Sequence, residues 1–383
     1  MSSIVTALVV VTSTGSVLLA CSSGHVIVAD LQRDGGSCQR EEPIQAVAAG
    51  DDHTCFVRTS GAMACFGQNL GQLGDGTTDS RQRPVPVMST ARFVGVAAGN
   101  DHTCALDVDG SAWCWGLNMI GQLGDGTADP SLIPKRISGF SFRAIATHFD
   151  TTCGVDATSR LLCWGANDSG QLGLDDLLPR SVPTTVGTET TWTHVSTGTT
   201  HTCGILGSAL YCWGGGSEGQ LGLGNEGSVS IPTLVSDGWV TVDAGNAHTC
   251  AIRTDRTLWC WGRNADHQVG TGGTEDRLLP VLVGEGAWTD ATASRLHTCA
   301  IHTDGSVECW GTGLGAALAF GAIAPTPRRI DLEGRFVRID SADDHTCALR
   351  DDATLWCWGE NGQAELGLGD TTDRPNPSIV CPP

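Results

Sequence analysis

The amino-acid sequence predicts an all-β protein built from seven similar units that pack against one another as one structure. The first observation is a spaced pair of cysteines that recurs at a period of about 49 residues, the separation of Cys55 and Cys104. The second is a series of short apolar runs bounded by glycine, aspartate and proline. The third is the count of 51 glycines in 383 residues. Runs and glycines of this kind are typical of many short strands joined by tight turns.

The repeat that contains Cys104 shows the four strands that we expect in each unit. Apolar runs occur at 84–87, 93–99, 103–108 and 111–115. They are rich in β-branched and aromatic residues, and their lengths fit strands rather than helices. Each unit is therefore expected to be a four-stranded antiparallel meander.

The two cysteines of each pair are expected to face each other across a hairpin. A three-residue loop centred on Asp109 places Cys104 opposite Cys114, and a two-residue loop, 207–208, keeps this register in the more closely spaced fourth pair. Opposed residues of this kind are close enough for a disulfide. The alternative is a metal site formed by thiolates and the preceding histidine, but the third repeat has Thr151 in place of that histidine. The predicted disulfides are Cys55–Cys65, Cys104–Cys114, Cys153–Cys163, Cys203–Cys212, Cys250–Cys260, Cys299–Cys309 and Cys347–Cys357.

A glycine-rich connector follows each hairpin. It reads Gly-Gln-Leu-Gly at 71–74 and again at 121–124. We expect the glycines to adopt positive φ and to pack against the neighbouring unit, and the leucine to be buried. A phosphate-binding loop is the alternative, but neither a lysine nor a helical pattern follows the glycines.

The N-terminal segment, 1–20, is predicted to be a secretory or lipoprotein signal. Its apolar run is too short to span a bilayer. Residues 18–21 read Leu-Leu-Ala-Cys and resemble a bacterial lipobox, in which Cys21 would be lipidated. A signal peptide should have a positively charged residue before its apolar run, but no lysine or arginine precedes this run. Another export signal and a stray half-repeat therefore stay open as alternatives. Residues 21–43 are expected to be a tether.

Hairpins of the form Ala-Leu…Asp-Gly…Trp-Gly, followed by Asn-x-x-Gly-Gln-Leu-Gly, resemble the regulator of chromosome condensation repeat family. The resemblance covers residues 44–383, although the sixth connector, 311–316, lacks Gln-Leu-Gly. It implies a seven-bladed β-propeller with one repeat per blade-equivalent. The cysteine pairs and the N-terminus indicate a bacterial exported type of this family. The founding member of the family is a nuclear nucleotide-exchange factor, but function transfers poorly between propellers.

The C-terminal strand is expected to close this propeller. Residues 375–380 resemble 83–87, so we expect them to form the first strand of a unit whose other strands begin at Ile44. Pairing of these strands would remove two exposed edges. Cys38 and Cys381 flank the same seam and are predicted to form an eighth disulfide. Cys21 is then unpaired, as lipidation requires.

Charge and motifs weigh against nucleic-acid binding and catalysis. The formal net charge is −20, and Lys135 is the only lysine, so the field of the protein repels phosphate backbones. Histidines that recur once per repeat are expected to make hydrogen bonds within or between blades. They are His53, His102, His201, His248, His297 and His345. The acidic pairs lack the spacing of a calcium loop. We therefore predict no enzyme activity, no cofactor and no metal site.

The predicted function is that of an exported monomer that binds another protein, either in the cell envelope or outside the cell. A lipid anchor at Cys21 would be its only contact with a membrane. The binding residues are expected in loops that differ from blade to blade on a constant scaffold. They are Asp79, Arg81, Asp129, Glu226 and Arg277. The alternatives are a regulator resembling guanine-nucleotide exchange factors and an enzyme with an unrecognised central site.

Overall fold

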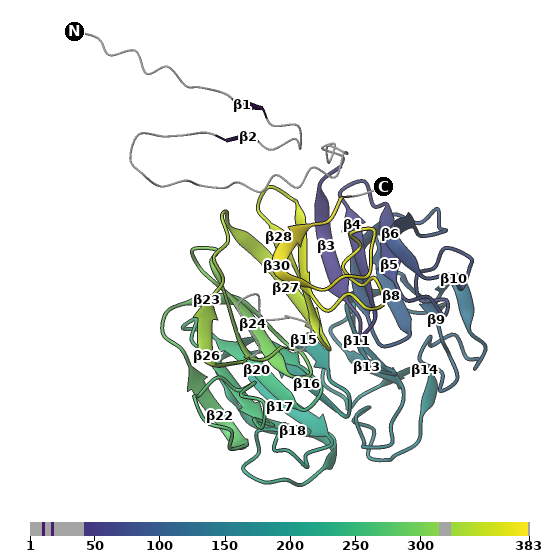
Figure 1. Cartoon of the computed structure of the whole chain (residues 1–383). Helices are drawn as coiled ribbons and strands as arrows, with labels where there is room; N and C mark the ends of the chain where they lie inside the picture. The colour runs from purple at the N-terminus through teal and green to yellow at the C-terminus, as the bar shows by residue number, and fades with distance from the viewer. Residues whose placement is uncertain (1–9, 12–16, 19–41, 314–322, 382–383) are drawn as a thin grey trace. The chain divides into compact units, whose positions relative to one another are not determined.

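The computed structural model describes residues 10–11, 17–18, 42–313 and 323–381. The chain divides into two units, residues 1–39 and 40–383. In the first unit the description is limited to two short paired strands, β1 (Val10–Val11) and β2 (Val17–Leu18). The second unit contains seven antiparallel sheets of four strands each (Figure 1). No described segment forms a helix long and apolar enough to cross a membrane.

Each sheet is one blade, and its four strands follow one another along the chain. The first strands of blades 1 to 7 contact one another in a ring and line the centre of the propeller. They are β3 (Ile44–Ala49), β7 (Phe93–Ala98), β11 (Phe142–His148), β15 (Trp192–Thr197), β19 (Trp239–Ala244), β23 (Trp288–Ala293) and β27 (Phe336–Ala342). The second strands are β4 (His53–Arg58), β8 (His102–Asp107), β12 (Thr151–Asp156), β16 (His201–Leu206), β20 (His248–Arg253), β24 (His297–His302) and β28 (His345–Arg350).

The third strands complete the hairpins, and the fourth strands form the outer edges. The third strands are β5 (Met63–Gly67), β9 (Ala112–Gly116), β13 (Leu161–Gly165), β17 (Ala209–Gly214), β21 (Leu258–Gly262), β25 (Val307–Thr312) and β29 (Leu355–Gly359). The fourth are β6 (Arg81–Pro86), β10 (Ser131–Arg136), β14 (Arg180–Thr185), β18 (Val229–Asp237), β22 (Arg277–Val283), β26 (Ile323–Arg329) and β30 (Arg374–Ile379). A proline inside every outer strand removes a backbone donor from the free edge, which blunts pairing with other chains.

The predicted hairpin disulfides are present in all seven blades. Cys104 pairs in register with Cys114, and their Cα atoms are 4.1 Å apart. Cys203 and Cys212 are also opposed, and Leu206 pairs with Ala209 across the expected two-residue loop. All fourteen cysteines are fully buried. The disulfide of each blade therefore joins its second and third strands inside the core.

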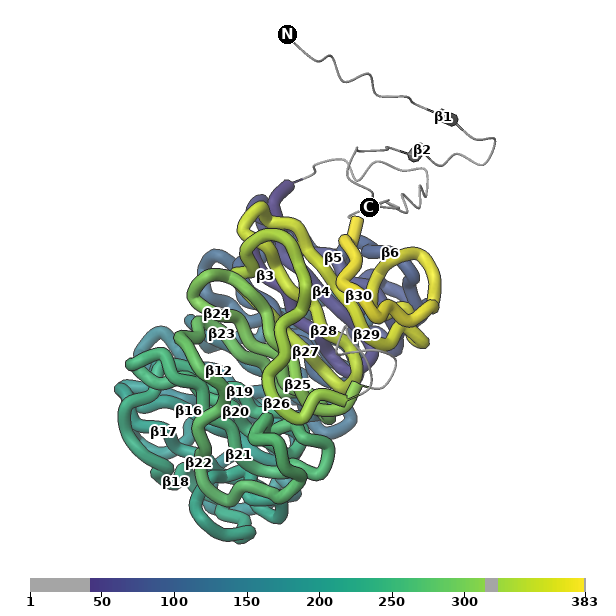
Figure 2. Tube along the Cα trace, turned by 60° about the vertical axis from the view of Figure 1, so that its left-hand side comes forward, coloured from purple at the N-terminus to yellow at the C-terminus, as the bar shows by residue number. Residues whose placement is uncertain are grey.

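The structure corrects the expected blade boundaries and the expected closure. β6, which contains the run at 84–86, pairs with β5 and is the outer strand of blade 1, not the first strand of the next unit. By the same arrangement β30 pairs with β29 and completes blade 7, so the C-terminal strand does not pair with the N-terminal strands. The ring closes because β27 and β28 pack against β3, as Figures 1 and 2 show where the yellow and purple ends meet.

The interfaces between blades are filled by tryptophan and leucine. Leu73 of the first connector is fully buried, as expected. The indole of Trp115 in blade 2 donates a hydrogen bond to the backbone carbonyl of Gln72 in blade 1 at 2.8 Å. Gly74 has a φ of 67°, and a Cβ at this position would lie 2.6 Å from Nε1 of Trp115. Glycine is therefore required here both by the backbone conformation and by the neighbouring indole.

Candidate functional site

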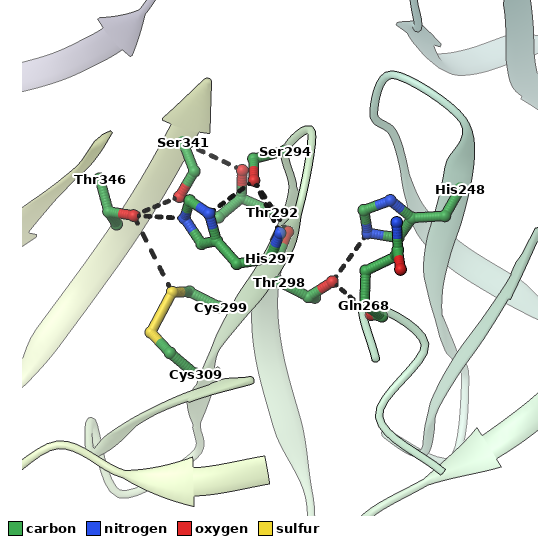
Figure 3. The surroundings of a disulfide bond; sticks show 10 residues. All are labelled: His248, Gln268, Thr292, Ser294, His297, Thr298, Cys299, Cys309, Ser341 and Thr346. Carbon is green, nitrogen blue, oxygen red and sulfur yellow. Dashed lines mark hydrogen bonds between the residues drawn. A yellow bond between two sulfur atoms is a disulfide. The ribbon is translucent and has the colours of Figure 1, made fainter. Parts of the chain in front are cut away.

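The repeated histidines join each blade to the next. Nε2 of His248 lies 2.8 Å from Oγ1 of Thr298, and the hydroxyl of Thr298 donates to the backbone carbonyl of Gln268 at 2.8 Å (Figure 3). The same contact occurs for His53–Thr103, His102–Thr152, His201–Thr249, His297–Thr346 and His345–Thr54. At the interface of blades 3 and 4, Thr151 replaces the histidine, and its hydroxyl donates to Ala166 within its own blade. The expected hydrogen bonding between blades is confirmed.

These histidines are neutral and structural. Because the hydroxyl of Thr298 gives its one proton to a carbonyl, its oxygen accepts the Nε2–H of His248. Burial, with a further contribution from neighbouring histidines, lowers the pKa of His248 to about 3. The repeated contact therefore fixes the blades to one another. It leaves none of these six histidines available as a base that faces solvent.

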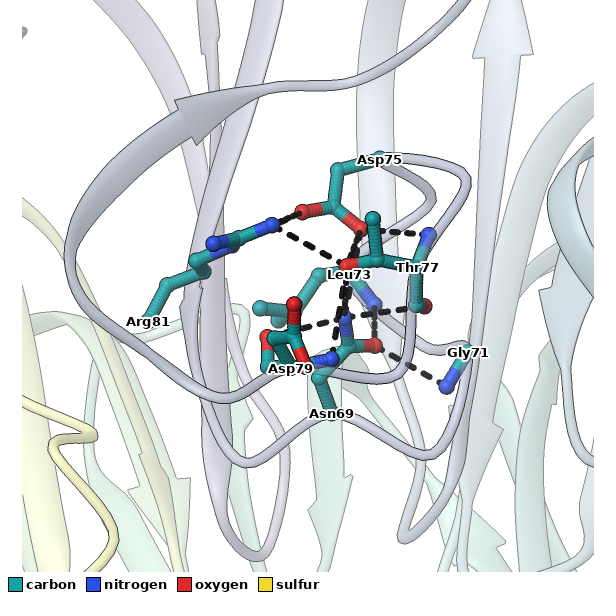
Figure 4. A network of polar contacts seen from close by, with 7 residues as sticks. All are labelled: Asn69, Gly71, Leu73, Asp75, Thr77, Asp79 and Arg81. Carbon is teal, nitrogen blue, oxygen red and sulfur yellow. Dashed lines mark hydrogen bonds and ion pairs between the residues drawn. The ribbon is translucent and has the colours of Figure 1, made fainter.

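The connectors share an internal frame of hydrogen bonds. In blade 1, Oδ1 of Asn69 accepts from the backbone N–H groups of Gly71 and Leu73, and its Nδ2 donates to the carbonyls of Thr77 and Asp79 (Figure 4). Equivalent frames are built on Asn118, Asn167, Asn264 and Asn361. Blade 4 has Gly216 at this position, and its connector is held differently, since the backbone N–H of Gly216 donates to Oγ of Ser228 at 3.2 Å. The frame holds each loop in place through its backbone.

The structure places the predicted binding residues in these connectors or next to them. The side chains of Asp79, Asp129 and Glu226 are exposed. Arg81 forms an ion pair with Asp75 at 2.7 Å and also donates to Thr77, so it belongs to the connector frame. Arg277 donates weakly to Thr271 at 3.5 Å. Asp79 and Asp129 are therefore presented on a backbone that the asparagine frame holds, and Arg81 supports the frame of blade 1. Glu226 is presented by the connector of blade 4, which lacks the asparagine.

The loops between the first and second strands place carboxylates on the same face as the connectors. Gln68 at the start of the first connector donates to the carbonyl of Asp52 at 2.8 Å. The acidic loops belong to blades 7, 1, 2 and 3 and contain Asp343, Asp344, Asp51, Asp52, Asp101 and Asp150. Burial raises the pKa of Asp51 to about 8, and the charges of Asp343, Asp52 and Asp101 add to the rise. The corresponding loops of blades 4 and 5, 198–200 and 245–247, have no charged residue.

A cavity of about 190 Å³ lies at the centre of the ring, between the first strands of the blades. Asp243 and Asp340 line it together with His148 and His194. Asp340 accepts from the backbone N–H of Ala49 at 2.9 Å, and burial, followed by the charge of Asp243, raises its pKa to about 8. The sequence interpretation did not single out these aspartates, although they alternate with apolar residues in the inner strands. Within the described ranges, no histidine, cysteine and carboxylate groups are arranged to hold a metal ion.

The remaining cysteines are only partly described. Cys381 is disulfide-bonded, and every other described cysteine is already paired within a hairpin. Cys21 and Cys38 lie outside the described residues. The Cys38–Cys381 bridge and the lipidation of Cys21 stay predictions.

Two family models and several solved structures match the chain. A model described as the regulator of chromosome condensation (RCC1) repeat matches residues 61–106, 109–158, 159–205, 208–252 and 256–301, and a second model of the same description matches 44–72, 239–268 and 336–364. No match is found among curated proteins. Together the matched repeats cover more than half of the chain.

The similar structures share the fold at low sequence identity. The Prp20p structure from Saccharomyces cerevisiae is 19% identical with a TM-score of 0.76, and the match covers 88% of this chain and 86% of that one. Human WBSCR16 is 20% identical with a TM-score of 0.52, over 89% and 82% of the two chains. The ectodomain of the Arabidopsis thaliana receptor kinase ACR4 is 18% identical with a TM-score of 0.53, over 88% and 99%. With its seven blades and its repeated connector motif, the chain belongs to the regulator of chromosome condensation (RCC1) repeat family.

Proposed function

We propose that this protein is an exported, non-catalytic propeller that binds another protein as a monomer through the face formed by its connectors and acidic loops. The observation that carries the proposal is a constant backbone with variable side chains. Five connectors are built on the same buried asparagine. The exposed residue whose carbonyl this asparagine binds is aspartate in blades 1 and 2, but leucine, glutamate and threonine in blades 3, 5 and 7. Variation on a fixed scaffold is how repeat proteins build a specific site.

The fold family supports a protein partner. One similar structure is described as yeast RCC1 (Prp20) bound to Kap60, and another title names the binding of Prp20p to Gsp1p and histones. The acidic face of this chain is complementary to a basic region of a partner, and charge of this kind speeds encounter more than it raises affinity. A net charge of −20 also disfavours nucleic acid as the partner.

The disulfides support an exported location. Seven buried bridges are typical of proteins that fold in an oxidising compartment. We infer that residues 1–20 direct export, that 21–43 form a tether, and that Cys21 is the site of lipid attachment in the cell envelope. A secreted form is the other outcome, and mass spectrometry of the mature N-terminus distinguishes the two.

Affinity capture from the native envelope fraction, followed by loop variants, tests the function. Charge reversal at Asp79, Asp129 or Glu226 is expected to weaken capture of the partner and to leave the Tm nearly unchanged, because these side chains are exposed. Arg81→Glu is the control that should lower the Tm, because it breaks the ion pair with Asp75. Partner binding that is unaffected by all three reversals would refute the connector face as the site. Capture of a nucleotide-dependent GTPase would favour an exchange factor instead.

A further inference from the structure

A second cavity, of about 420 Å³, lies between blades 3 and 4. Blade 3 contributes residues 173–175 and the segment around Glu189, and blade 4 contributes Trp192, Leu206 and Tyr211. The rings of Trp192 and Tyr211 are arranged edge to face, with centroids 5.8 Å apart. The exposed carboxylates of Asp175 and Glu189 line the same cavity. Aromatic and acidic groups are thus combined in one concave site.

Trp192, which lines this cavity, has a donor that no protein group satisfies. The residue is 1% exposed, and its Nε1–H has no hydrogen-bond partner. The corresponding tryptophan of blade 5, Trp239, donates to Oγ of Ser236 at 3.0 Å. Because a buried N–H without an acceptor costs about 1–3 kcal/mol, the site favours a ligand that supplies an acceptor.

Comparison of the seven blades indicates which other group the ligand carries. The residue opposite the start of each inner strand is polar in six blades and apolar only in blade 4. In chain order it is Arg58, Asp107, Asp156, Leu206, Arg253, His302 and Arg350.

Blade 5 shows how a cation occupies this position. Cζ of Arg253 lies 4.6 Å from the ring centroid of Trp239 and 4.7 Å from that of Trp259. Trp192 and Tyr211 of blade 4 occupy the same register as these two rings, but Leu206 supplies no cation. Blade 4 therefore keeps the aromatic pair and adds two carboxylates nearby.

We propose that this cavity binds an arginine side chain from an extended basic segment of a partner protein. The guanidinium would lie against the ring of Tyr211, with Asp175 and Glu189 opposing its charge, and a carbonyl of the segment would accept the Nε1–H of Trp192. Arg143 donates to the backbone carbonyl of Trp192 and does not line the cavity. The inference rests on the proposed protein-binding function and names the chemistry of one partner segment.

A neutral sugar could also stack on an aromatic ring and accept from an indole. The two carboxylates and the position of Arg253 favour the cation instead. Arginine is preferred to lysine because a planar guanidinium both stacks and donates several hydrogen bonds to carboxylates.

The probe is the blocked tripeptide acetyl-Gly-Arg-Gly-amide, and the readout is the indole N–H region of the ¹⁵N-labelled protein. Trp192→Phe identifies the signal of Trp192, and this variant should fold because Phe93, Phe142 and Phe336 occupy the same position in other blades. The tripeptide is expected to shift this one signal saturably. The citrulline analogue, which has the shape of arginine without its charge, is expected to bind about tenfold more weakly.

Variants separate this site from the connector face. Leu206→Arg should place the protein's own guanidinium in the cavity, as in blade 5, and abolish the shift. The double variant Asp175→Asn/Glu189→Gln should weaken binding about tenfold or more, because it removes both opposing charges. The exposed Asp109→Asn in blade 2 is the control and should leave binding unchanged.

Three results would overturn the proposal: equal shifts with arginine and citrulline, binding that survives Leu206→Arg, or a shift produced by a neutral disaccharide and not by the arginine peptide. Loss of partner capture by the connector variants alongside any of these results would leave the proposed function standing.

Discussion

Replacing Glu365 by glutamine should stabilise the protein above pH 7. Glutamine occupies this connector position in blades 1 to 5. In blade 2, Oε1 of Gln122 accepts from the backbone N–H of Ile120, and its Nε2 donates to Oδ1 of Asp150 in the next blade at 2.7 Å. Glu365 makes the first contact, since it accepts from Gln363 at 2.7 Å. An ionised Glu365 cannot donate, however, and the next blade presents Asp52, the counterpart of Asp150.

The magnitude follows from the pKa of Glu365. Burial raises it from 4.5 to about 7, and the charges of Asp52 and Glu360 add to the rise. Between these pH values the folded protein keeps a proton that the unfolded chain has lost, so stability falls as the pH rises through this window. A shift of about 2.5 pKa units corresponds to about 3 kcal/mol at pH 8. Glutamine does not titrate, so the variant should gain about this amount at pH 8 and differ little from the wild type at pH 4.5.

Urea denaturation at pH 4.5, 6 and 8, with the disulfides intact, measures this difference. Gln122→Glu makes the reverse exchange opposite Asp150 and should lose stability at pH 8. Gln171→Glu is the matched control. The corresponding loop of blade 4, 198–200, has no acidic residue, so this variant should lose less stability at pH 8 than Gln122→Glu. The reasoning fails if Glu365→Gln does not raise the free energy of unfolding at pH 8, or if the gain is the same at pH 4.5.

Three further predictions concern the scaffold. Thr103→Val should cost about 2–3 kcal/mol in urea denaturation, because it leaves the N–H of His53 unpaired and removes one of the two hydrogen bonds to the carbonyl of Gln72. Thr202→Val removes only one of the two hydrogen bonds to the carbonyl of Gln171 and should cost about 1 kcal/mol. Ala353→Gly should stabilise the protein by about 1 kcal/mol, seen as a higher Tm, because Ala353 has a φ of 65°. Alkylation without reductant, followed by mass spectrometry, should find all fourteen hairpin cysteines protected and a peptide linking Cys38 to Cys381. Free thiols at most hairpin positions would contradict both the disulfides and export.

The hairpins could be predicted from the sequence because strand geometry is strictly periodic. Cys203 and Cys212 are nine residues apart, one fewer than Cys104 and Cys114. A loop shortened by one residue restores the opposition of the two side chains. The cysteine spacing and the glycine of the turn are therefore sufficient to determine the register. The repeated histidines were predictable for a similar reason, since a residue present at nearly every interface has the same structural role at each.

The start of a blade could not be predicted, because a repeat of four strands has the same period wherever it begins. Residues 84–86 are followed closely by 93–98 in sequence, and this proximity favoured their assignment to the next unit. In the structure β6 pairs with β5, although the 13-residue connector 68–80 separates the two strands. The connector can be this long because a buried asparagine orders it from within. Side-chain hydrogen bonds of this kind are not visible in the hydrophobic pattern.

The cavity between blades 3 and 4 was missed because it depends on a departure from the repeat rather than on a motif. Two departures occur at this interface. Thr151 replaces the bridging histidine, and Leu206 replaces a polar residue. In a closed ring each blade is held by two neighbours and by its own disulfide, so one weaker interface is tolerated when the other six keep their histidine contacts. A binding site is most easily built where the scaffold depends least on the residues being changed. The interface without the histidine contact is therefore the place in this ring where a cavity with an unpaired indole N–H and two exposed carboxylates costs the fold least.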